Sequence, residues 1–176
     1  MMFPALRFVH NNQKGFTLIE LIIAIAIAAL ITGGITAAIM QILTINTRAS
    51  NHMVAVRQVQ QAGKEVSKDA LQAQAVNATT PSQGFPLTLT WTEWGTNQTH
   101  TVTYTLEDMS GGLKKLQREH FDSALNSTTT TIVAEYISSA SFVQLPSAVV
   151  YDFTVTATVG DQSETRIYKV QPRPGS

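Results

Sequence analysis

Residues 15–31 read GFTLIELIIAIAIAALI, an apolar run that contains a single carboxylate, Glu20. The apolar pattern continues to Ile45, and a helix of that length would extend about 45 Å at about 1.5 Å per residue. The hydrocarbon core of a bilayer is about 30 Å thick, so residues 21–40 alone are long enough to cross it. The run therefore predicts a transmembrane helix over residues 16–45.

The segment before this run has the character of a leader. Residues 1–14 carry the basic residues Arg7 and Lys14 and no acidic residue. An ordinary secretory signal places its cleavage site after the apolar core. Here the small residue Gly15 precedes the apolar core. Cleavage after Gly15 would remove a leader of residues 1–15 and would leave the apolar helix on the mature protein.

The carboxylate of Glu20 has two interpretations. The spacing from Thr17 to Glu20 fits a capping box, and an acid in the first turn suits the helix dipole. A carboxylate inside a membrane costs about 2.5–3.5 kcal/mol or more unless it is paired. Cleavage after Gly15 would create a positively charged amine on Phe16, about one helical turn from Glu20. The residues are consistent with capping alone and with ion pairing.

Together these features resemble the N-terminus of type IV prepilins and of type II secretion pseudopilins: a basic leader ending in Gly15, Phe16-Thr17-Leu18, Glu20 five positions after the glycine, and a long apolar helix. The resemblance implies a filament subunit that a prepilin peptidase cleaves between Gly15 and Phe16. It implies N-methylation of Phe16 and pairing of Glu20, with Thr17 beside it, to the amine of a neighbouring subunit.

The same resemblance implies where the chain resides and what it contacts. The chain would be a single-pass protein of the cytoplasmic membrane with its N-terminus on the cytoplasmic side and its C-terminal domain outside, and after assembly it would be part of a cell-surface or periplasmic filament. Arg7 and Lys14 favour this orientation, and basic residues after the helix weaken the bias. The implied partners are the prepilin peptidase, other pilins or pseudopilins, an inner-membrane assembly platform and the lipid bilayer. Many major pilins close a C-terminal loop with a disulfide, which this cysteine-free chain cannot form. A minor pilin or pseudopilin is therefore favoured.

Gly33 and Gly34 interrupt the apolar run, and each glycine costs about 1 kcal/mol in a helix relative to alanine. Small residues permit close helix packing. In the family that the chain resembles, the helix often unwinds in this region within a filament. Both interpretations, close packing and helix flexibility at Gly33-Gly34, remain open.

Residues 46–76 are more polar but keep a helical period, which predicts an amphipathic helix that ends near Asn77, ahead of Pro81. Its small apolar members would let a sheet approach closely. The stripe consists of Met53, Val56, Val59, Gly63, Val66, Ala70 and Ala73.

Residues 77–176 alternate between apolar and threonine-rich positions, which is typical of half-buried strands. Residues 113–121 fit a strand or a short helix, and a strand is favoured because a hairpin would continue the meander. The predicted class is α+β, with a long N-terminal helix packed on an antiparallel sheet, as in pilins. The Val102-Thr103-Tyr104 strand, the following glycine turn and the basic strand after Leu113 also loosely resemble the minor pilins that cap a filament tip. The expected strands cover residues 85–94, 101–106, 113–121, 128–137, 149–159 and 165–170.

Composition and motifs exclude several kinds of catalytic and metal-binding chemistry. The chain has 12 basic and 12 acidic residues and no cysteine, so disulfides, thiol catalysis and cysteine-bound zinc are excluded. Neither a phosphate-binding loop nor a nucleophile motif occurs. Glu119, His120 and Asp122 could gather a metal, but a solvated loop is the preferred interpretation. No catalytic residue, metal site or cofactor is predicted, and the chain is not expected to be an enzyme.

Two alternatives remain. Lys114, Lys115, Arg118 and His120 form a basic cluster that would suit a DNA-binding module of a competence pseudopilus, although a solvated strand face is favoured and nucleic acid is an unlikely partner. The other alternative is a single-pass anchored protein with an uncleaved N-terminus, which could be an extracytoplasmic enzyme.

Overall fold

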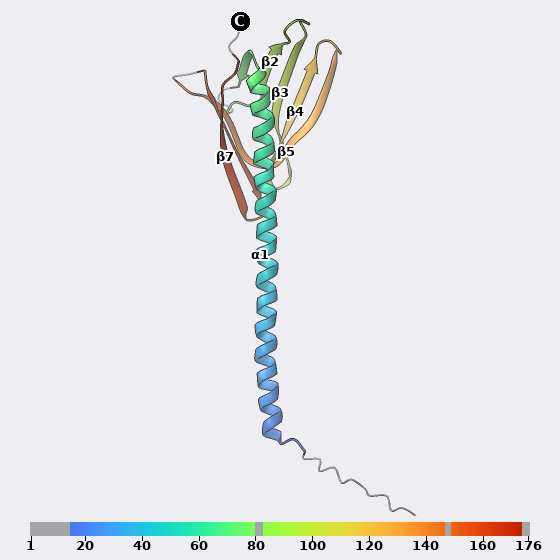
Figure 1. Ribbon diagram of the computed structural model, residues 1–176, viewed down its shortest axis with the longest axis vertical. Helices are drawn as coiled ribbons and strands as arrows, with labels where there is room; N and C mark the ends of the chain where they lie inside the picture. The colour runs from blue at the N-terminus through green and yellow to red at the C-terminus, as the bar shows by residue number, and fades with distance from the viewer. Residues whose placement is uncertain (1–14, 80–82, 147–148, 174–176) are drawn as a thin grey trace, which may run out of the picture. The chain divides into compact units, whose positions relative to one another are not determined.

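The computed structural model describes residues 15–79, 83–146 and 149–173, so the leader charges Arg7 and Lys14 lie outside the described residues. The chain divides into two units, residues 1–45 and residues 46–176, which are described separately. The elements are α1 (Leu18–Gln72), β1 (Ala75–Ala78), β2 (Leu87–Thr92), β3 (Thr99–Asp108), the 3₁₀ turn η1 (Ser110–Gly112), β4 (Lys114–Asp122), β5 (Ser127–Gln144), β6 (Tyr151–Val159) and β7 (Gln162–Val170) (Figure 1).

The first unit contains the apolar part of α1. By length and composition this helix could cross a membrane. Its threonines would bring hydroxyl groups into an apolar environment, and each donates to the carbonyl four residues earlier: Thr32 to Ala28 at 2.8 Å, and Thr36 and Thr44 likewise at 2.9 Å. The hydroxyl groups are therefore satisfied within the helix itself. The helix runs through Gly33-Gly34 without a break, and neither glycine has another group within 4 Å of the Cβ position.

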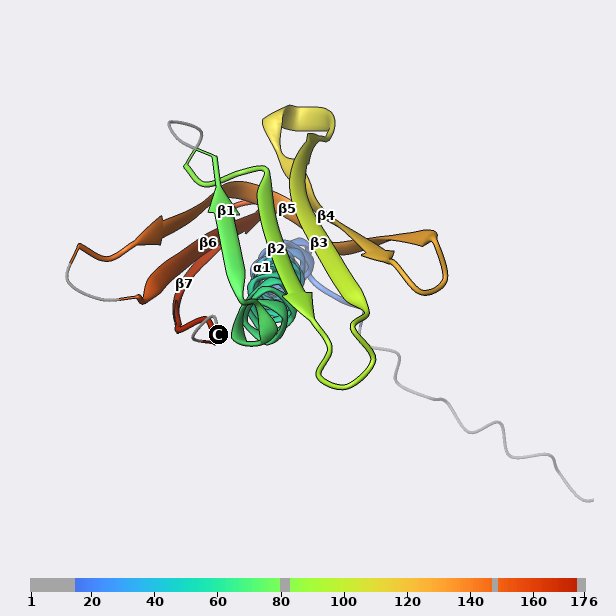
Figure 2. The same ribbon diagram turned by 90° about the horizontal axis from the view of Figure 1, so that it is seen from above.

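The second unit contains an antiparallel meander. Its seven-stranded sheet has the order β1-β2-β3-β4-β5-β6-β7, with each strand antiparallel to its neighbour. The predicted α+β class is confirmed, and residues 114–122 form a strand, as expected. The long strand β5 pairs with β4 through its first half and with β6 through its second. Tyr136, with a φ of 59°, lies where the pairing changes, and the sheet curls around the helix (Figure 2).

The core of this unit lies between α1 and the inner face of the sheet. Val59, Val66 and Ala70 of the expected stripe are fully buried, as are Val102 and Phe153 from the strands. The expected stripe is wrong at its start, because Met53 is 57% exposed and Val56 only half-buried. The buried face of α1 instead includes the small residues Ala55 and Ala62, which allow the sheet to approach the helix backbone.

The close approach is tightest at Gly63. A Cβ at this position would fall inside the ring of Tyr168 from β7, whose hydroxyl donates a hydrogen bond to the carbonyl of Val59 at 3.1 Å. Gly63 is therefore required by packing, although glycine costs about 1 kcal/mol in a helix.

We expect Gly63→Ala to lower the free energy of unfolding by about 1–3 kcal/mol. The added methyl group would displace Tyr168, and the energetic cost of this overpacking exceeds the gain in helix propensity. Chemical denaturation followed by circular dichroism measures the change. Tyr168→Ala removes the clashing ring, so the double variant should lose less stability than the two single losses added together. Simple additivity would contradict the proposed contact.

The end of α1 differs from the expectation. The helix ends at Gln72, not near Asn77, and residues 75–78 form β1. Gln74 explains the difference: its backbone N–H donates to the carbonyl of Thr90 at 2.9 Å, and its side-chain oxygen accepts from the N–H of Thr92 at 3.2 Å. These hydrogen bonds to the edge of β2 replace the hydrogen bonds that would continue the helix. Because β2 is distant in sequence, no local sequence pattern indicates that the helix ends here.

Candidate functional site

The first candidate site is the start of α1, where Thr17 and Glu20 form a reciprocal cap. The backbone N–H and the hydroxyl of Thr17 both donate to Oε2 of Glu20, at 2.9 and 2.8 Å. The N–H of Glu20 in turn donates to the Thr17 hydroxyl at 3.4 Å. This is the capping box that the spacing predicts.

The cap leaves part of the carboxylate free. Both contacts use Oε2, and Oε1 of Glu20 has no hydrogen bond within the described part of the chain. Gly15 and Phe16 precede the helix, and Phe16 is 90% exposed. The geometry thus combines an accessible Gly15–Phe16 bond with a carboxylate that is oriented by Thr17 and can accept from a further donor.

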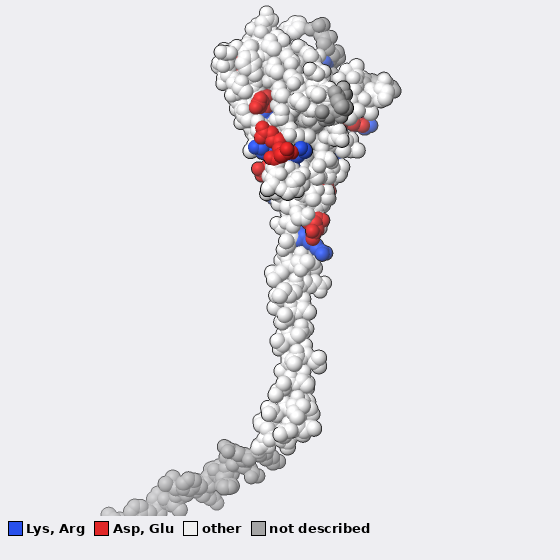
Figure 3. All heavy atoms as spheres, turned by 180° about the vertical axis from the view of Figure 1, so that it is seen from behind, with Lys and Arg blue, Asp and Glu red and all other residues white. Residues whose placement is uncertain are grey.

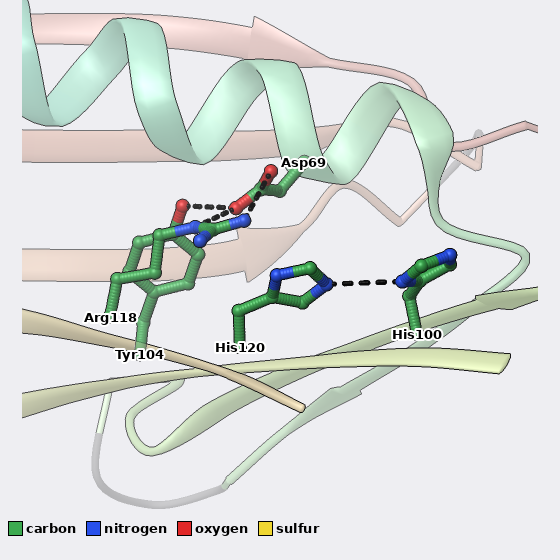
Figure 4. A network of polar contacts seen from close by, with 5 residues as sticks. All are labelled: Asp69, His100, Tyr104, Arg118 and His120. Carbon is green, nitrogen blue, oxygen red and sulfur yellow. Dashed lines mark hydrogen bonds and ion pairs between the residues drawn. The ribbon is translucent and has the colours of Figure 1, made fainter. Parts of the chain in front are cut away.

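A second polar cluster, absent from the sequence-based prediction, lies inside the domain and joins α1 to β3 and β4. Asp69 is 1% exposed, accepts from the Tyr104 hydroxyl at 2.6 Å, and binds Arg118 through Nε at 2.6 Å and through a terminal nitrogen at 3.2 Å (Figure 4). Burial, followed by the Asp69 charge, raises the pKa of Tyr104. Burial alone would lower the pKa of Arg118, but its hydrogen bond and ion pair with Asp69 raise it.

The basic cluster that suggested DNA binding is neutralised within the domain. Lys114 pairs with Asp108, Lys115 with Glu107 at 2.8 Å, and Arg118 with Asp69. Figure 3 shows blue and red groups side by side on the visible face of the domain rather than an extended patch of one sign. A phosphate backbone needs uncompensated cations, so the structure removes the main support for the DNA interpretation.

His120 lies in β4, in agreement with the strand expected over residues 113–121, so the solvated loop preferred over a metal site at Glu119, His120 and Asp122 is not present. Alternation along the strand places Glu119 on the opposite face from His120 and Asp122. Within residues 15–79, 83–146 and 149–173, no group of three or more His, Asp or Glu residues could hold a metal. His120 instead contacts His100 on the neighbouring strand β3, with 3.2 Å between Nε2 of His120 and Nδ1 of His100. Both rings stack on Trp91.

Protonation of His120 should destabilise this domain. Burial, and next the charges of Arg118 and His100, lower the pKa of His120 below its usual 6.5. Below pH 6.5 the unfolded state therefore binds more protons than the folded one, so stability is complete above that pH and falls as the pH drops toward the folded-state pKa. Denaturation midpoints between pH 7.5 and 5.5 should fall in the wild type and fall less in His120→Phe. Equal slopes in the two proteins would contradict the assignment to His120.

Comparison with known proteins addresses the N-terminal site. Residues 10–36 match the family model of the prokaryotic N-terminal methylation motif, the prepilin motif of type IV pilin-like proteins. The matched range includes the expected cleavage position between Gly15 and Phe16, the Thr17–Glu20 cap and the glycine pair. No curated protein and no solved structure matches the chain.

The motif supports a type IV pilin-like protein, and such proteins are structural filament subunits. It implies processing by a prepilin peptidase and assembly with other pilins. A helix that could span a membrane is consistent with a pilin-type membrane anchor.

Proposed function

We propose that this chain is a minor pilin or pseudopilin subunit of a type IV filament system, which is a pilus, a type II secretion pseudopilus or a DNA-uptake filament. The proposal rests on the half-satisfied Glu20 carboxylate, which lies within a matched methylation motif and is followed by a helical segment, residues 21–45, without any charged residue. The apolar helix supplies the packing surface, and the β domain forms the outer surface of the filament.

Processing would come first in this proposal. A prepilin peptidase cleaves the peptide bond between Gly15 and Phe16, removing a leader whose Arg7 and Lys14 hold the N-terminus on the cytoplasmic side. The new amine of Phe16 is then methylated and keeps its positive charge. The chain remains a single-pass protein of the cytoplasmic membrane, with its C-terminal domain outside, until it is assembled.

Assembly would follow from the electrostatics of the bilayer. An unpaired carboxylate in a transmembrane segment costs about 2.5–3.5 kcal/mol. Attraction to the amine of a neighbouring subunit is strong in an environment of low dielectric constant. Glu20 would therefore select the incoming subunit and set its axial position, while Thr17 keeps the carboxylate aligned through Oε2.

The proposed organisation assigns residues 16–45 to the membrane and filament core. The amphipathic helix, corrected to residues 46–72, is the spine of the external domain, which continues to the C-terminus. Because no neighbouring group surrounds Gly33-Gly34 in the isolated chain, the pair is free to pack against a neighbouring helix or to unwind on assembly.

Filament fractions test the proposal. Filaments sheared from cells that express the full set of assembly genes should contain the chain, and deletion of the prepilin peptidase or the assembly ATPase should retain it in the membrane fraction. A resident pilin of the same cells serves as the positive control. If that pilin assembles and this chain stays wholly in the membrane, the proposed role is wrong.

A further inference from the structure

We propose that His100 and His120 form a binding site for a divalent transition-metal ion of the kind that prefers imidazole ligands, such as Zn²⁺, Ni²⁺ or Cu²⁺. The site would lie on the inner face of β3 and β4, and it goes beyond the role of the chain as a filament subunit. Figure 4 shows the two imidazole rings side by side, next to the Asp69–Arg118 pair.

The distance between the two imidazole nitrogens matches that of two ligands on one metal ion. Nδ1 of His100 lies 3.2 Å from Nε2 of His120. Two imidazole nitrogens that each lie about 2.0–2.1 Å from one tetrahedral zinc ion are about 3.3 Å apart. In the contact seen here one of these nitrogens donates to the other, so its ring must first move that proton to its other nitrogen. A rotation of the rings would then direct both lone pairs at one ion without moving either strand.

The two rings are also held in place before any ligand arrives. They come from paired strands, in which Val102 lies opposite His120 and Asp122 opposite His100. Trp91 of β2 stacks on both, with ring centroids 5.4 Å from His100 and 6.0 Å from His120. A preorganised pair of ligands loses little conformational freedom on binding.

The charges around the pair permit a cation. Arg118 lies on the same strand as His120, but its charge is compensated by the buried carboxylate of Asp69 from α1. Asp122, on the face of β4 that carries His120, adds a negative charge that acts on His120.

The number of protein ligands determines the expected affinity for the metal ion. Two imidazoles are the protein ligands, and water molecules would complete the coordination sphere, so the affinity should be well below that of a four-ligand structural zinc site. Imidazole ligands suit zinc, copper and nickel, whereas Mg²⁺ and Ca²⁺ prefer oxygen ligands. The site should therefore discriminate between these two groups of ions.

Trp91 provides a local reporter. The test uses the full chain in detergent micelles, with Trp94→Phe introduced because Trp94 is 86% exposed and would dominate the fluorescence. Ni²⁺ or Cu²⁺ at pH 7.5 should quench Trp91 with one saturable site, Zn²⁺ should compete, and Mg²⁺ should have no effect. His100→Phe and His120→Phe keep an aromatic ring on Trp91 and should each weaken binding at least tenfold.

His52→Ala is the matched control, because His52 is an exposed histidine of α1 and should not alter the affinity. Circular dichroism without metal verifies that each variant is folded, and Zn²⁺ should raise the melting temperature of the parent but not that of the double His→Phe variant. Unchanged binding after both His→Phe substitutions, or an equal loss in His52→Ala, would overturn the proposal. So would the absence of saturable quenching in the parent.

Discussion

Replacing Glu20 by leucine should reduce incorporation into filaments by about a hundredfold while membrane insertion is preserved. The carboxylate costs about 2.5–3.5 kcal/mol in an apolar environment unless it is paired, which corresponds to about two orders of magnitude in an equilibrium constant. Leucine removes both the cost and the ion pair, so the subunit would remain stable in the membrane. Immunoblots of sheared filaments and of the membrane fraction, from cells that also make the wild-type chain, measure the ratio.

Two further substitutions separate ion pairing from helix capping. Glu20→Gln keeps an oxygen that can accept from the Thr17 N–H but removes the charge, so it should assemble as poorly as Glu20→Leu. Thr17→Ala keeps the charge and loses the cap, at a cost of about 1 kcal/mol to the helix end, and should still assemble. If Glu20→Gln assembled like the wild type, the function of the carboxylate would be capping alone.

Replacing Asp69 by alanine should lower the free energy of unfolding by about 3–5 kcal/mol, because it leaves the partly buried Arg118 without its counter-ion. The same change leaves the buried Tyr104 hydroxyl without an acceptor. Denaturant unfolding followed by circular dichroism measures the loss, and a fall of less than about 1 kcal/mol would contradict a structural role for this pair.

The matched control is the exposed pair between Lys114 and Asp108. Asp108→Ala should change stability by less than about 1 kcal/mol at neutral pH, since exposed ion pairs contribute little. A triple replacement, Asp69→Leu with Tyr104→Phe and Arg118→Met, removes every charge of the buried cluster. It should recover much of the stability lost in Asp69→Ala, because burying apolar groups avoids the desolvation of two ions.

The sequence predicted those parts of the fold that depend on local patterns. The apolar run and the Thr17–Glu20 spacing predicted the helix start and its cap, and alternation predicted β2, β3, β6 and β7. It failed at β1, because the helix ends where Gln74 finds partners on β2 rather than at a local stop signal. It also predicted only residues 128–137 of the long strand β5 (Ser127–Gln144), whose two halves pair with different neighbours.

Polar side chains that meet in space were the harder part to predict. Asp69 sits in an apolar helix face, and its partners Tyr104 and Arg118 are 35 and 49 residues away. The available signal was a single acidic residue, Asp69, within a stripe of small apolar residues. That stripe does not indicate which residues bind the acid. For the same reason the lysines of β4 resembled a free basic cluster, although each has an acidic partner on β3.

We propose that the chain is processed at Gly15, so that Phe16 carries the charge that Glu20 recognises. Intact-mass and N-terminal peptide mass spectrometry of the protein purified from its own cells tests this most directly. The expected result is a chain that begins at Phe16 with one added methyl group on its amine. A cellular protein that retains residues 1–15 in cells where a resident prepilin is fully processed would contradict the account.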